Sequence, residues 1–504
     1  MTPHSLNLSQ LQAVESEAQS LLIVAGPGTG KTHTLTQRIV SHLAHLEQGR
    51  KILAITFTRK AAEEMFDRLS ARGPDVRDRI FVGTFHQFCV TILQQYCDLD
   101  CEIASPEECL RIARLIWADI SVSECKKRLE EISRWKAVNF RYAAPGIVRE
   151  FNKALRVKHL YDFDDLLMET FFQLQKDAQI LVRIRRDFPE VCVDEYQDIN
   201  AIQHDLLKLL IGKTQRITAI GDPNQAIYGF RGSDVAFFHS FEQDFPKAQV
   251  LYLQENYRNA KDLLLASSQV IAPDVDDAVP EQVARMYMEG HLTVHQAKTD
   301  RAEAEFVVHT IEQLVGGTSM FSQDSGRVDR EVEGEISFGD IAVLYRLKSQ
   351  SRELEKAFAR SGMPFHVVGT QAASEDITDD LFAQYYEEPE SEAEKVSLMT
   401  LHASKGLEFS CVFICGCEEG LMPLHLFKMT SDEKEERRLL YVGMTRAKHR
   451  LFLTHARKRV LYGNTLNNEP SRFLTHIEES LKNYSQSRHR PRPEKPDDGQ
   501  MQLF

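Results

Sequence analysis

Short apolar runs alternate with longer amphipathic stretches along most of this chain of 504 residues. The runs LLIV (21–24), KILAIT (51–56) and EVCV (190–193) are each followed by residues with helical spacing of their apolar positions. Short, continuous apolar runs are typical of strands buried on both faces of a sheet, and their alternation with helices is typical of parallel βα units. The pattern therefore predicts an α/β protein.

Three segments depart from this alternation. Residues 91–159 have a helical, charged pattern without a strand-like run, which predicts an inserted helical subdomain. The polar segment 316–335 has the composition of a surface loop. Residues 484–504 are rich in Pro, Arg and Asp, and we expect them to be disordered up to their last five positions.

Composition narrows the class of protein. A hydrophobic content of 42% allows large cores, and the length suggests three or four domains. No stretch approaches the roughly 18 to 20 apolar residues of a membrane span, and the start MTPHSLNLSQ does not resemble a signal sequence. We therefore expect a cytoplasmic protein without a membrane partner. The net charge of −13 argues against a protein coated with nucleic acid, although a local groove can be basic on an acidic body.

The nine cysteines show no disulfide framework. Cys97, Cys101, Cys109 and Cys125 could in principle hold zinc or an iron–sulfur cluster, but their gaps match no ligand pattern, and small apolar helix residues are the favoured interpretation. The run FSCVFICGC (409–417) predicts cysteines packed in a buried strand.

The strongest chemical signal is AGPGTGKT (25–32), which lies between an apolar strand and a helical pattern. Glycines at 26, 28 and 30 allow successive backbone N–H groups to turn toward a phosphate chain, and the following helix directs its positive end there. Lys31 would contact the β- and γ-phosphates and Thr32 would hold Mg²⁺. Only Ala25 departs from the strict P-loop pattern. The loop predicts nucleotide binding through Ala25, Gly26, Pro27, Gly28, Thr29, Gly30, Lys31 and Thr32.

Asp194 and Glu195 follow the apolar strand in PEVCVDEYQD (189–198). In a P-loop enzyme an aspartate at this position holds Mg²⁺, and an adjacent glutamate can orient and deprotonate the attacking water. Adjacent carboxylates at a strand end are otherwise costly, because like charges repel. Solvated surface acids are the alternative interpretation.

Aromatic side chains, hydroxyls and positive charge recur at strand ends. Phe57 lies beside Arg59 and Lys60, and FVGTFHQF (81–88) repeats the combination with Thr84 and His86. Such groups suit a single-stranded nucleic acid, whose bases stack and whose phosphates accept hydrogen bonds. For Phe85 and Phe88 we favour a core position. In GDPNQAIYGFRG (221–232) the amide of Gln225 could sense a γ-phosphate, while Tyr228 and Phe230 offer stacking faces.

The order of these motifs closely resembles that of the superfamily 1A DNA helicases of the UvrD, PcrA and Rep type. The resemblance runs from LNLSQLQAV (6–14) through LQENYRNAKDLL (253–264) and VSLMTLHASKGLEF (396–409) to EERRLLYVGMTRAKHRLFLTHARKR (435–459). It implies two RecA-like P-loop lobes with a helical insertion in the first lobe. It also implies that ATP hydrolysis drives 3′-to-5′ movement along single-stranded DNA, with duplex unwinding at junctions.

The resemblance also implies roles for individual residues. It assigns phosphate and Mg²⁺ chemistry to Lys31, Thr32, Asp194 and Glu195, γ-phosphate sensing to Gln225, and two arginine fingers to Arg258 and Arg446. Gln10 and Tyr257 would contact the adenine, Glu408 would contact the nucleotide from the second lobe, and His33 stands where the family often has arginine. The strand-binding positions are Phe57, Thr84, His86, Tyr228, Phe230, Thr400 and His402.

By the same resemblance, residues 1–90 and 160–259 form the first lobe (1A), 91–159 its insertion (1B) and 260–483 the second lobe (2A). Relatives carry a large helical insertion, 2B, before the motif VSLMTLH. Here only residues 371–395 fill that place, and so short an acidic segment cannot form a domain with its own core.

The resemblance leaves other functions open. A helicase–nuclease subunit of the RecB or AddA kind shares several motifs, but no nuclease-type cluster of carboxylates and lysine follows the last motif. A DNA-dependent ATPase that acts as a switch or recruitment factor remains possible. A scaffold without hydrolysis is disfavoured, because every catalytic position is filled.

The last five residues, QMQLF (500–504), resemble the short peptide with which bacterial replication and repair proteins bind the sliding clamp. Gln500 would form a hydrogen bond at the rim of a pocket, and Leu503 and Phe504 would fill an apolar groove, on a flexible tether. The alternative is a tail of random sequence.

Overall fold

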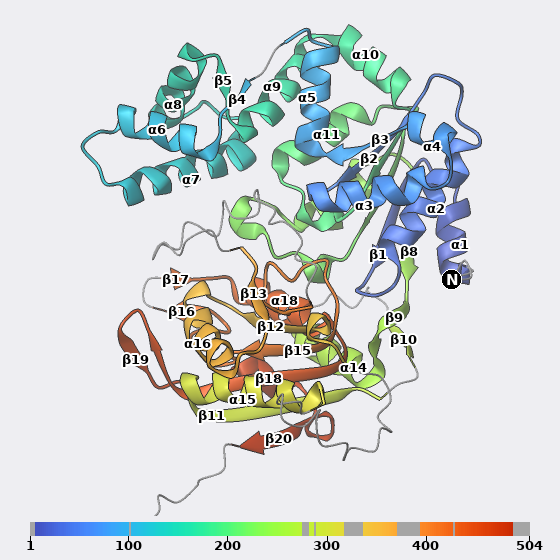
Figure 1. The fold of residues 1–504 in the computed structure, drawn as a ribbon. Coiled ribbons are helices and arrows are strands. Elements are labelled where there is room, and N and C mark those ends of the chain that lie inside the picture. The colour runs from blue at the N-terminus through green and yellow to red at the C-terminus, as the bar shows by residue number, and fades with distance from the viewer. Residues whose placement is uncertain are drawn as a thin grey trace, which may run out of the picture.

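The computed structural model describes residues 6–99, 102–274, 282–286, 289–316, 336–369, 394–426 and 429–486. Two large sheets dominate these residues, one in each half of the chain, and helices cover both faces of each sheet (Figure 1). The predicted α/β class with two RecA-like lobes is confirmed.

The first sheet has six parallel strands in the order β3-β2-β6-β7-β1-β8. Helices α2 and α3 pack on one face of the sheet, and α5, α9, α10 and α11 pack on the other. The apolar runs of the sequence are the buried strands. Their bounds are β1 (Ser20–Ala25), β2 (Ile52–Thr56), β3 (Ile80–Thr84), β6 (Glu190–Val193), β7 (Arg216–Gly221) and β8 (Ala248–Leu253).

The helices of this lobe begin with α1 and end with two short helices before β8. Several have a side-chain cap at the N-terminus, such as Asn7 on α1 and Thr58 on α3, which satisfies backbone N–H groups that the helix leaves free. The bounds are α1 (Leu8–Glu15), α2 (Lys31–Leu43), α3 (Arg59–Ser70), α4 (Pro74–Asp78), α5 (Phe85–Gln95), α9 (Phe163–Lys176), α10 (Ala178–Asp187), α11 (Ala201–Leu210), α12 (Ala236–His239) and α13 (Phe241–Asp244).

The helical insertion consists of α6 (Pro106–Ile116), α7 (Val122–Asn139) and α8 (Gly146–Val157), which share their own core. It projects to one side of the first lobe (Figure 1). Strands β4 (Glu102–Ile103) and β5 (Leu160–Tyr161) pair where the chain leaves and returns. The boundary drawn from the sequence at residue 91 falls inside α5, whose apolar residues belong to the core of the first lobe.

The second sheet has eight strands, seven of them in the parallel order β13-β14-β12-β15-β18-β11-β20. Helices α14 and α18 pack on one face, and α15 and α16 on the other. The bounds are β11 (His291–Thr299), β12 (Ile341–Tyr345), β13 (Phe365–Val367), β14 (Val396–Thr400), β15 (Phe409–Cys415), β18 (Ala447–Leu461), β19 (Asn464–Leu466), β20 (Asn483–Gln486), α14 (Lys261–Ile271), α15 (Asp300–Leu314), α16 (Ser351–Ser361) and α18 (Glu433–Met444).

Two small pairs of strands complete the described fold. Strands β9 (Glu255–Ala260) and β10 (Val283–Met286) lie where the chain passes from the first lobe to the second. Strands β16 (His425–Leu426) and β17 (Met429–Thr430) pair in antiparallel orientation before α18.

The end of the chain differs from the sequence-based expectation. Residues 484–486 belong to β20 at the edge of the second sheet, although their composition predicts disorder. Pairing with β11 and the contact between Ser485 Oγ and His295 Nδ1, at 2.7 Å, provide partners that composition does not reveal. The predicted clamp-binding residues Gln500, Leu503 and Phe504 lie outside the described residues. So do the segments 317–335 and 370–393, which include most of the predicted loop and of the reduced insertion.

Cys411 and Cys415 are buried in strand β15 as predicted, and Cys417 is buried just after the strand ends. Cys101 lies outside the described residues. Across the described ranges, no three side chains of His, Cys, Asp or Glu gather as a metal-binding group. No helix in the described part of the chain is long and apolar enough to cross a membrane.

Candidate nucleotide site and nucleic-acid interface

The P-loop connects β1 to α2 at the carboxyl edge of the first sheet. Gly28 and Gly30 have φ angles of 69° and 81°, which side chains rarely tolerate, and Gly30 is the N-cap of α2. Thr29 Oγ1 donates a hydrogen bond to the carbonyl oxygen of Gly26 at 2.8 Å and closes the loop. Lys31 and Thr32 are the first residues of the helix. This arrangement presents backbone N–H groups and a helix N-terminus to an anion.

Asp194 and Glu195 follow β6 beside the P-loop. Thr32 Oγ1 lies 3.5 Å from Asp194 Oδ2, and the backbone N–H of Glu195 donates to Asp194 Oδ1 at 2.9 Å. Glu195 has a φ of 51°, an uncommon backbone conformation for a residue with a side chain. Its carboxylate also accepts a hydrogen bond from the amide of Gln197.

The pKa values of the Asp194 and Glu195 carboxyl groups shift in opposite directions. Burial, together with the charge of Glu195, raises the pKa of Asp194 to about 7. Burial would also raise the pKa of Glu195, but the positive charges of Lys31 and Lys405 outweigh it and lower that pKa to about 2. Glu195 is therefore the carboxylate that stays ionised beside the P-loop.

Arg446 reaches this site from the second lobe. Its guanidinium is buried, donates from Nε to the carbonyl oxygen of Val442 at 2.9 Å, and places Nη2 3.4 Å from Oε1 of Gln225. Burial and repulsion from Arg258 lower its pKa to about 9. Arg258 Nε itself donates to Glu408 Oε2 at 2.7 Å. The residues predicted from both lobes therefore meet at one interface.

Lys405 belongs to this interface, although the sequence analysis did not single it out. Its ammonium group pairs with the carboxylate of Asp198, donates to the carbonyl oxygen of Gln225 at 2.9 Å, and lies 3.9 Å from Glu195 Oε2. Only the position of this lysine inside VSLMTLHASKGLEF was a signal. Its partners come from far away in the sequence and could not be read from spacing.

Two amides further secure the interface. Asn259 Nδ2 donates to the carbonyl oxygens of Thr445 and Ala447, at 3.0 and 2.7 Å, on either side of Arg446. Asn256 Nδ2 donates to the carbonyl oxygen of Pro27 at 2.7 Å and so connects β9 to the P-loop. Neither residue was predicted, because asparagine after a strand is equally typical of a turn.

The residues predicted to contact the adenine lie beside the P-loop. Gln10 is buried and donates to the carbonyl oxygen of Thr29 at 3.0 Å. The backbone N–H of Tyr257 donates to the carbonyl oxygen of Gly28 at 2.8 Å, and this tyrosine is 46% exposed. His33 is the third residue of α2 and is partly exposed. A planar base could therefore lie against Tyr257 beside Gln10.

Aromatic rings form a continuous series from the first lobe to the second. The ring centroids of Phe57 and Tyr228 are 4.9 Å apart and stacked, those of Tyr228 and Phe230 are 6.1 Å apart, and those of Phe230 and His402 are 5.5 Å apart. We call these four residues the aromatic shelf. Tyr228 is only 4% exposed, so in this arrangement it supports Phe57 and Phe230 and does not offer a free stacking face.

The remaining predicted strand-binding residues also have structural contacts. Thr84 Oγ1 caps α5 by accepting from the N–H of Gln87, and Thr400 Oγ1 accepts from the N–H of Ala403, both at 3.3 Å. Burial and the nearby Arg59 lower the pKa of His86 to about 4, so this imidazole is neutral at pH 7. Phe85 and Phe88 are buried in the core of the first lobe, which confirms the prediction.

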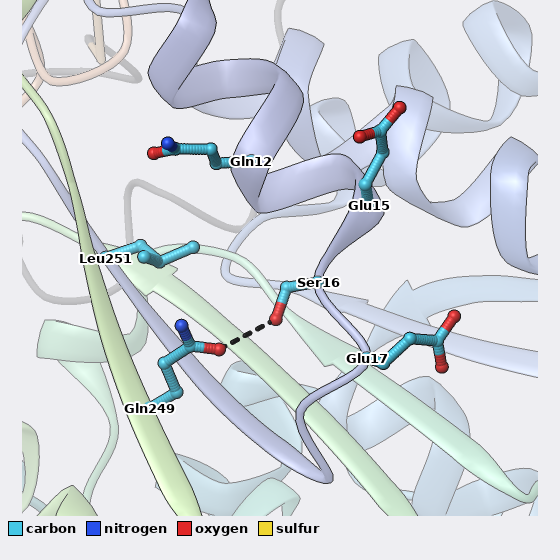
Figure 2. Close-up of a pocket in the computed structure, with 6 residues that line it drawn as sticks. All are labelled: Gln12, Glu15, Ser16, Glu17, Gln249 and Leu251. Atoms are coloured by element: carbon cyan, nitrogen blue, oxygen red, sulfur yellow. Dashed lines mark hydrogen bonds between the residues drawn. The ribbon is translucent and has the colours of Figure 1, made fainter.

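A separate shallow pocket of about 420 Å³ lies between the end of α1 and the edge strand β8 (Figure 2). Gln249 and Leu251 line one side, and Ser16 Oγ donates to Gln249 Oε1 at 2.9 Å. None of the predicted site residues lines this pocket, so it is distinct from the P-loop site.

The fold and the interface define a P-loop nucleotide hydrolase with two RecA-like lobes. Two family models match the chain, the UvrD/REP helicase N-terminal domain over residues 6–113 and 111–246, and the UvrD-like helicase C-terminal domain over 251–373 and 378–458. The chain belongs to the UvrD/PcrA family of superfamily 1 helicases, and it is an enzyme of the DNA helicase class.

Similar curated proteins are named ATP-dependent DNA helicase PcrA. The protein of Leuconostoc citreum is 29% identical, and the match covers 95% of this chain and 85% of that protein. The protein of Staphylococcus aureus strain Mu50 is 28% identical over 94% of this chain and 86% of its own length. The protein of Staphylococcus epidermidis is 27% identical over 95% and 87%.

Proposed function

We propose that this chain is an ATP-driven motor that moves 3′ to 5′ along single-stranded DNA and acts at duplex junctions. One observation carries the proposal: a single loop, residues 225–230, connects the interface of Lys31, Glu195 and Arg446 to the aromatic shelf. A change at the nucleotide site therefore has a short physical route to the groups that would stack on bases.

In the proposed reaction, Lys31 and the P-loop N–H groups bind the phosphate chain, and Glu195 orients the attacking water and accepts its proton. Gln225 would contact the γ-phosphate, and the Arg446 and Arg258 guanidinium groups would neutralise charge that develops on the transferred phosphoryl group. Gln10 and Tyr257 would hold the adenine, and His33 would border that pocket. Glu408, which pairs with Arg258 and with Lys448, would contact the nucleotide from the second lobe.

The Thr32 hydroxyl and the Asp194 carboxylate fit a Mg²⁺ ion that accompanies the nucleotide. Both are hard oxygen donors, they lie 3.5 Å apart, and the carboxylate is buried beside the P-loop. A bound Mg²⁺ would neutralise negative charge on the phosphates.

On the nucleic-acid side, Phe57, Phe230 and His402 would stack on or border the bases, with Tyr228 behind them. Thr84, His86 and Thr400 would line the path of the strand. Since Phe57 comes from the first lobe and His402 from the second, closure of the cleft would shift one part of the shelf against the other.

The proposal includes a reduced 2B insertion. The alignment with the Leuconostoc protein spans 665 positions, more than this chain has residues, so that relative contains residues that are missing here. The C-terminal family model is matched in two parts that meet at residues 373 to 378, in the segment assigned to the insertion. Both observations support the proposal.

The test combines ATPase and strand-displacement assays on 3′-tailed, 5′-tailed and blunt duplexes. We expect single-stranded DNA to stimulate ATP hydrolysis, and we expect a dye at the 5′ end of a single strand to report arrival of the motor. ATP hydrolysis that does not respond to DNA would contradict the proposal. Stimulation without directional arrival would favour the switch or recruitment factor.

We also propose that Gln500, Leu503 and Phe504 bind the sliding clamp and tether the motor at replication or repair sites. Two bulky apolar residues at the end of a polar tail support this proposal. Deletion of residues 500–504 should abolish clamp binding and leave DNA-stimulated ATPase intact. Unchanged clamp affinity after the deletion would contradict it.

A further inference from the structure

The loop 225–230 begins in the first lobe but packs into the second. Ile227 and Tyr228 are 0% and 4% exposed, and both belong to the core cluster that contains Leu439 and Leu440 of α18. The loop follows β7 of the first sheet directly through the short turn Pro223–Gln225. Ile227 and Tyr228 are therefore packed in the core of the second lobe, although the loop begins in the first lobe.

Polar contacts join the same loop to α18 at two points and to Arg446, two residues beyond the end of this helix, at a third. Arg438 Nε donates to the carbonyl oxygen of Ala226 at 2.7 Å, and the backbone N–H of Gly229 donates to Glu435 Oε1 at 3.1 Å. At the far end of the helix, Arg446 Nη2 lies 3.4 Å from Gln225 Oε1. The loop therefore lies along roughly three turns of the helix.

The absence of a side chain at Gly229 makes room for the contact with Glu435. A Cβ atom at this position would lie 2.5 Å from Glu435 Oε2, which is nearer than such atoms approach. Gly229 does not have a positive φ, so space and not backbone conformation accounts for the glycine. Residue 229 thus lies against the carboxylate of Glu435.

By contrast, the loop meets Phe57 of the first lobe through a ring contact. The rings of Phe57 and Tyr228 stack with centroids 4.9 Å apart, a contact that has no directional hydrogen bond of the kind that joins the loop to α18. The start of the loop, at Gln225, is hydrogen-bonded to Asp222 of the first lobe. If the lobes move, we expect the contact between Phe57 and Tyr228 to change before the hydrogen bonds with α18 break.

We propose that Glu435 and Arg438 are positioning residues that fasten the loop 225–230 to α18, so that Tyr228 and Phe230 move together with Arg446 and the second lobe. This inference rests on the proposed motor function and deepens it. The step along the strand then takes place between Phe57 and Tyr228, and α18 is the rigid element that connects hydrolysis with movement.

The experiment compares Glu435→Ala and Arg438→Ala with Lys434→Ala, whose side chain is exposed on the same helix. The measured quantity is the number of nucleotides travelled per ATP hydrolysed, from translocation and ATPase rates on the same single strand. Loss of one hydrogen bond to a charged group predicts about a tenfold loss of coupling for each variant. Lys434→Ala should keep the coupling of the parent chain.

A conservative variant and a double variant distinguish positioning from general damage. Glu435→Gln keeps an oxygen that accepts from the N–H of Gly229, so it should restore most of the coupling. Gly229→Ala should impair coupling in the parent chain. In a Glu435→Ala background it should cause little further loss of coupling, because the new alanine methyl group at position 229 no longer meets the Glu435 carboxylate. Binding of a fluorescent ATP analogue reports that each variant retains a folded P-loop.

Parental coupling in both alanine variants would overturn the inference, as would full additivity of Gly229→Ala and Glu435→Ala. Failure of the proposed function is distinguishable from this, because it appears in the parent chain as ATPase that single-stranded DNA does not stimulate. Lost coupling with glutamine rescue would support the inference.

Discussion

At the scale of single residues, Glu195 combines an unusual backbone with a well-defined electrostatic environment. Its φ is positive, and the charges of Lys31 and Lys405 hold the pKa of its carboxylate low in spite of its burial. Glu195→Gln should preserve the shape of the site and remove the base, so we expect ATP turnover to fall about 10² to 10⁴-fold with nucleotide binding retained. Steady-state ATPase with saturating single-stranded DNA, and binding of a fluorescent ATP analogue, measure the two effects. Turnover near the parent rate would remove Glu195 from its proposed role.

His295 connects pH to stability. It is 2% exposed, its ring stacks on Phe306 with centroids 3.5 Å apart, and burial lowers its pKa to about 4. The unfolded chain binds a proton near pH 6.5 and the folded chain does not, so stability should fall as pH drops from 6.5 to 4. The loss attributable to this residue grows as pH falls through this range and is complete below about pH 4.

His295→Asn removes the titrating group and keeps a side-chain amide near Ser485. Chemical denaturation at several pH values measures the free energy of unfolding. Between pH 6.5 and 4 this free energy should fall less for the variant than for the parent chain, and above pH 7 the difference between the two proteins should be constant. Because the other histidines are present in both proteins, the difference between the curves isolates His295. Parallel curves from pH 7 down to pH 4 would contradict the prediction.

Local sequence was sufficient for some of these residues and insufficient for others. Lys31, Thr32 and Asp194 lie in short patterns that combine residue type with strand or helix ends, so the sequence predicted their proximity. Lys405 and Asn259 depend on partners from the other lobe, which spacing does not reveal. Exposure was also hidden, because an aromatic residue such as Tyr228 has the same local pattern whether it faces solvent or a core.

At the scale of elements, a hydrogen bond from Asn256 attaches strand β9 to the P-loop. Asn256 is fully buried, donates to the carbonyl oxygen of Pro27, and accepts from the N–H groups of Arg258 and Asn259, both at 2.9 Å. The same strand carries Tyr257 and Arg258, so the P-loop and two proposed nucleotide contacts are held as one unit.

Asn256→Ala should raise the KM for ATP by tenfold or more and lower the melting temperature, because buried N–H and carbonyl groups lose their partners. Asn256→Asp keeps the acceptor for both N–H groups but loses the Nδ2 donor, which also contacts Asn259 Oδ1 at 3.0 Å. It therefore separates the contacts that Asn256 donates from those that it accepts. Gln254→Ala, an exposed change just before the strand, is the control. An unchanged KM in both Asn256 variants would show that the tether has no role in nucleotide binding.

The hydrophobic pattern was a good guide to most elements and a poor one to edges. LLIV and KILAIT became β1 and β2 within a residue or two, since buried parallel strands need continuous apolar runs. Strands β9 and β20 carry mostly polar residues and exist because of backbone pairing with neighbours that are distant in sequence, so no local pattern predicts them.

At the scale of the whole molecule, several direct contacts join the two lobes. The ion pair of Lys405 with Asp198, the amide of Asn259 and the loop 225–230 all cross between them. These contacts define one arrangement of the two lobes, which is one of the states that the proposed motor requires.

Unwinding a duplex requires more of the molecule than movement along a single strand does. Movement along one strand needs the two lobes and the aromatic shelf, whereas separation of a duplex needs an element that positions the duplex ahead of the motor. The segment proposed to replace 2B, residues 371–395, is too short to form such a domain. We therefore expect the chain alone to translocate on single strands but to displace a 3′-tailed duplex weakly.

Both rates should be measured on one preparation, with a 5′-end dye for arrival and a labelled duplex for displacement. Robust unaided displacement of a long duplex would contradict this prediction. It would indicate that loss of 2B releases the motor from a restraint, and that the helical insertion α6 to α8 is the next element to test by deletion.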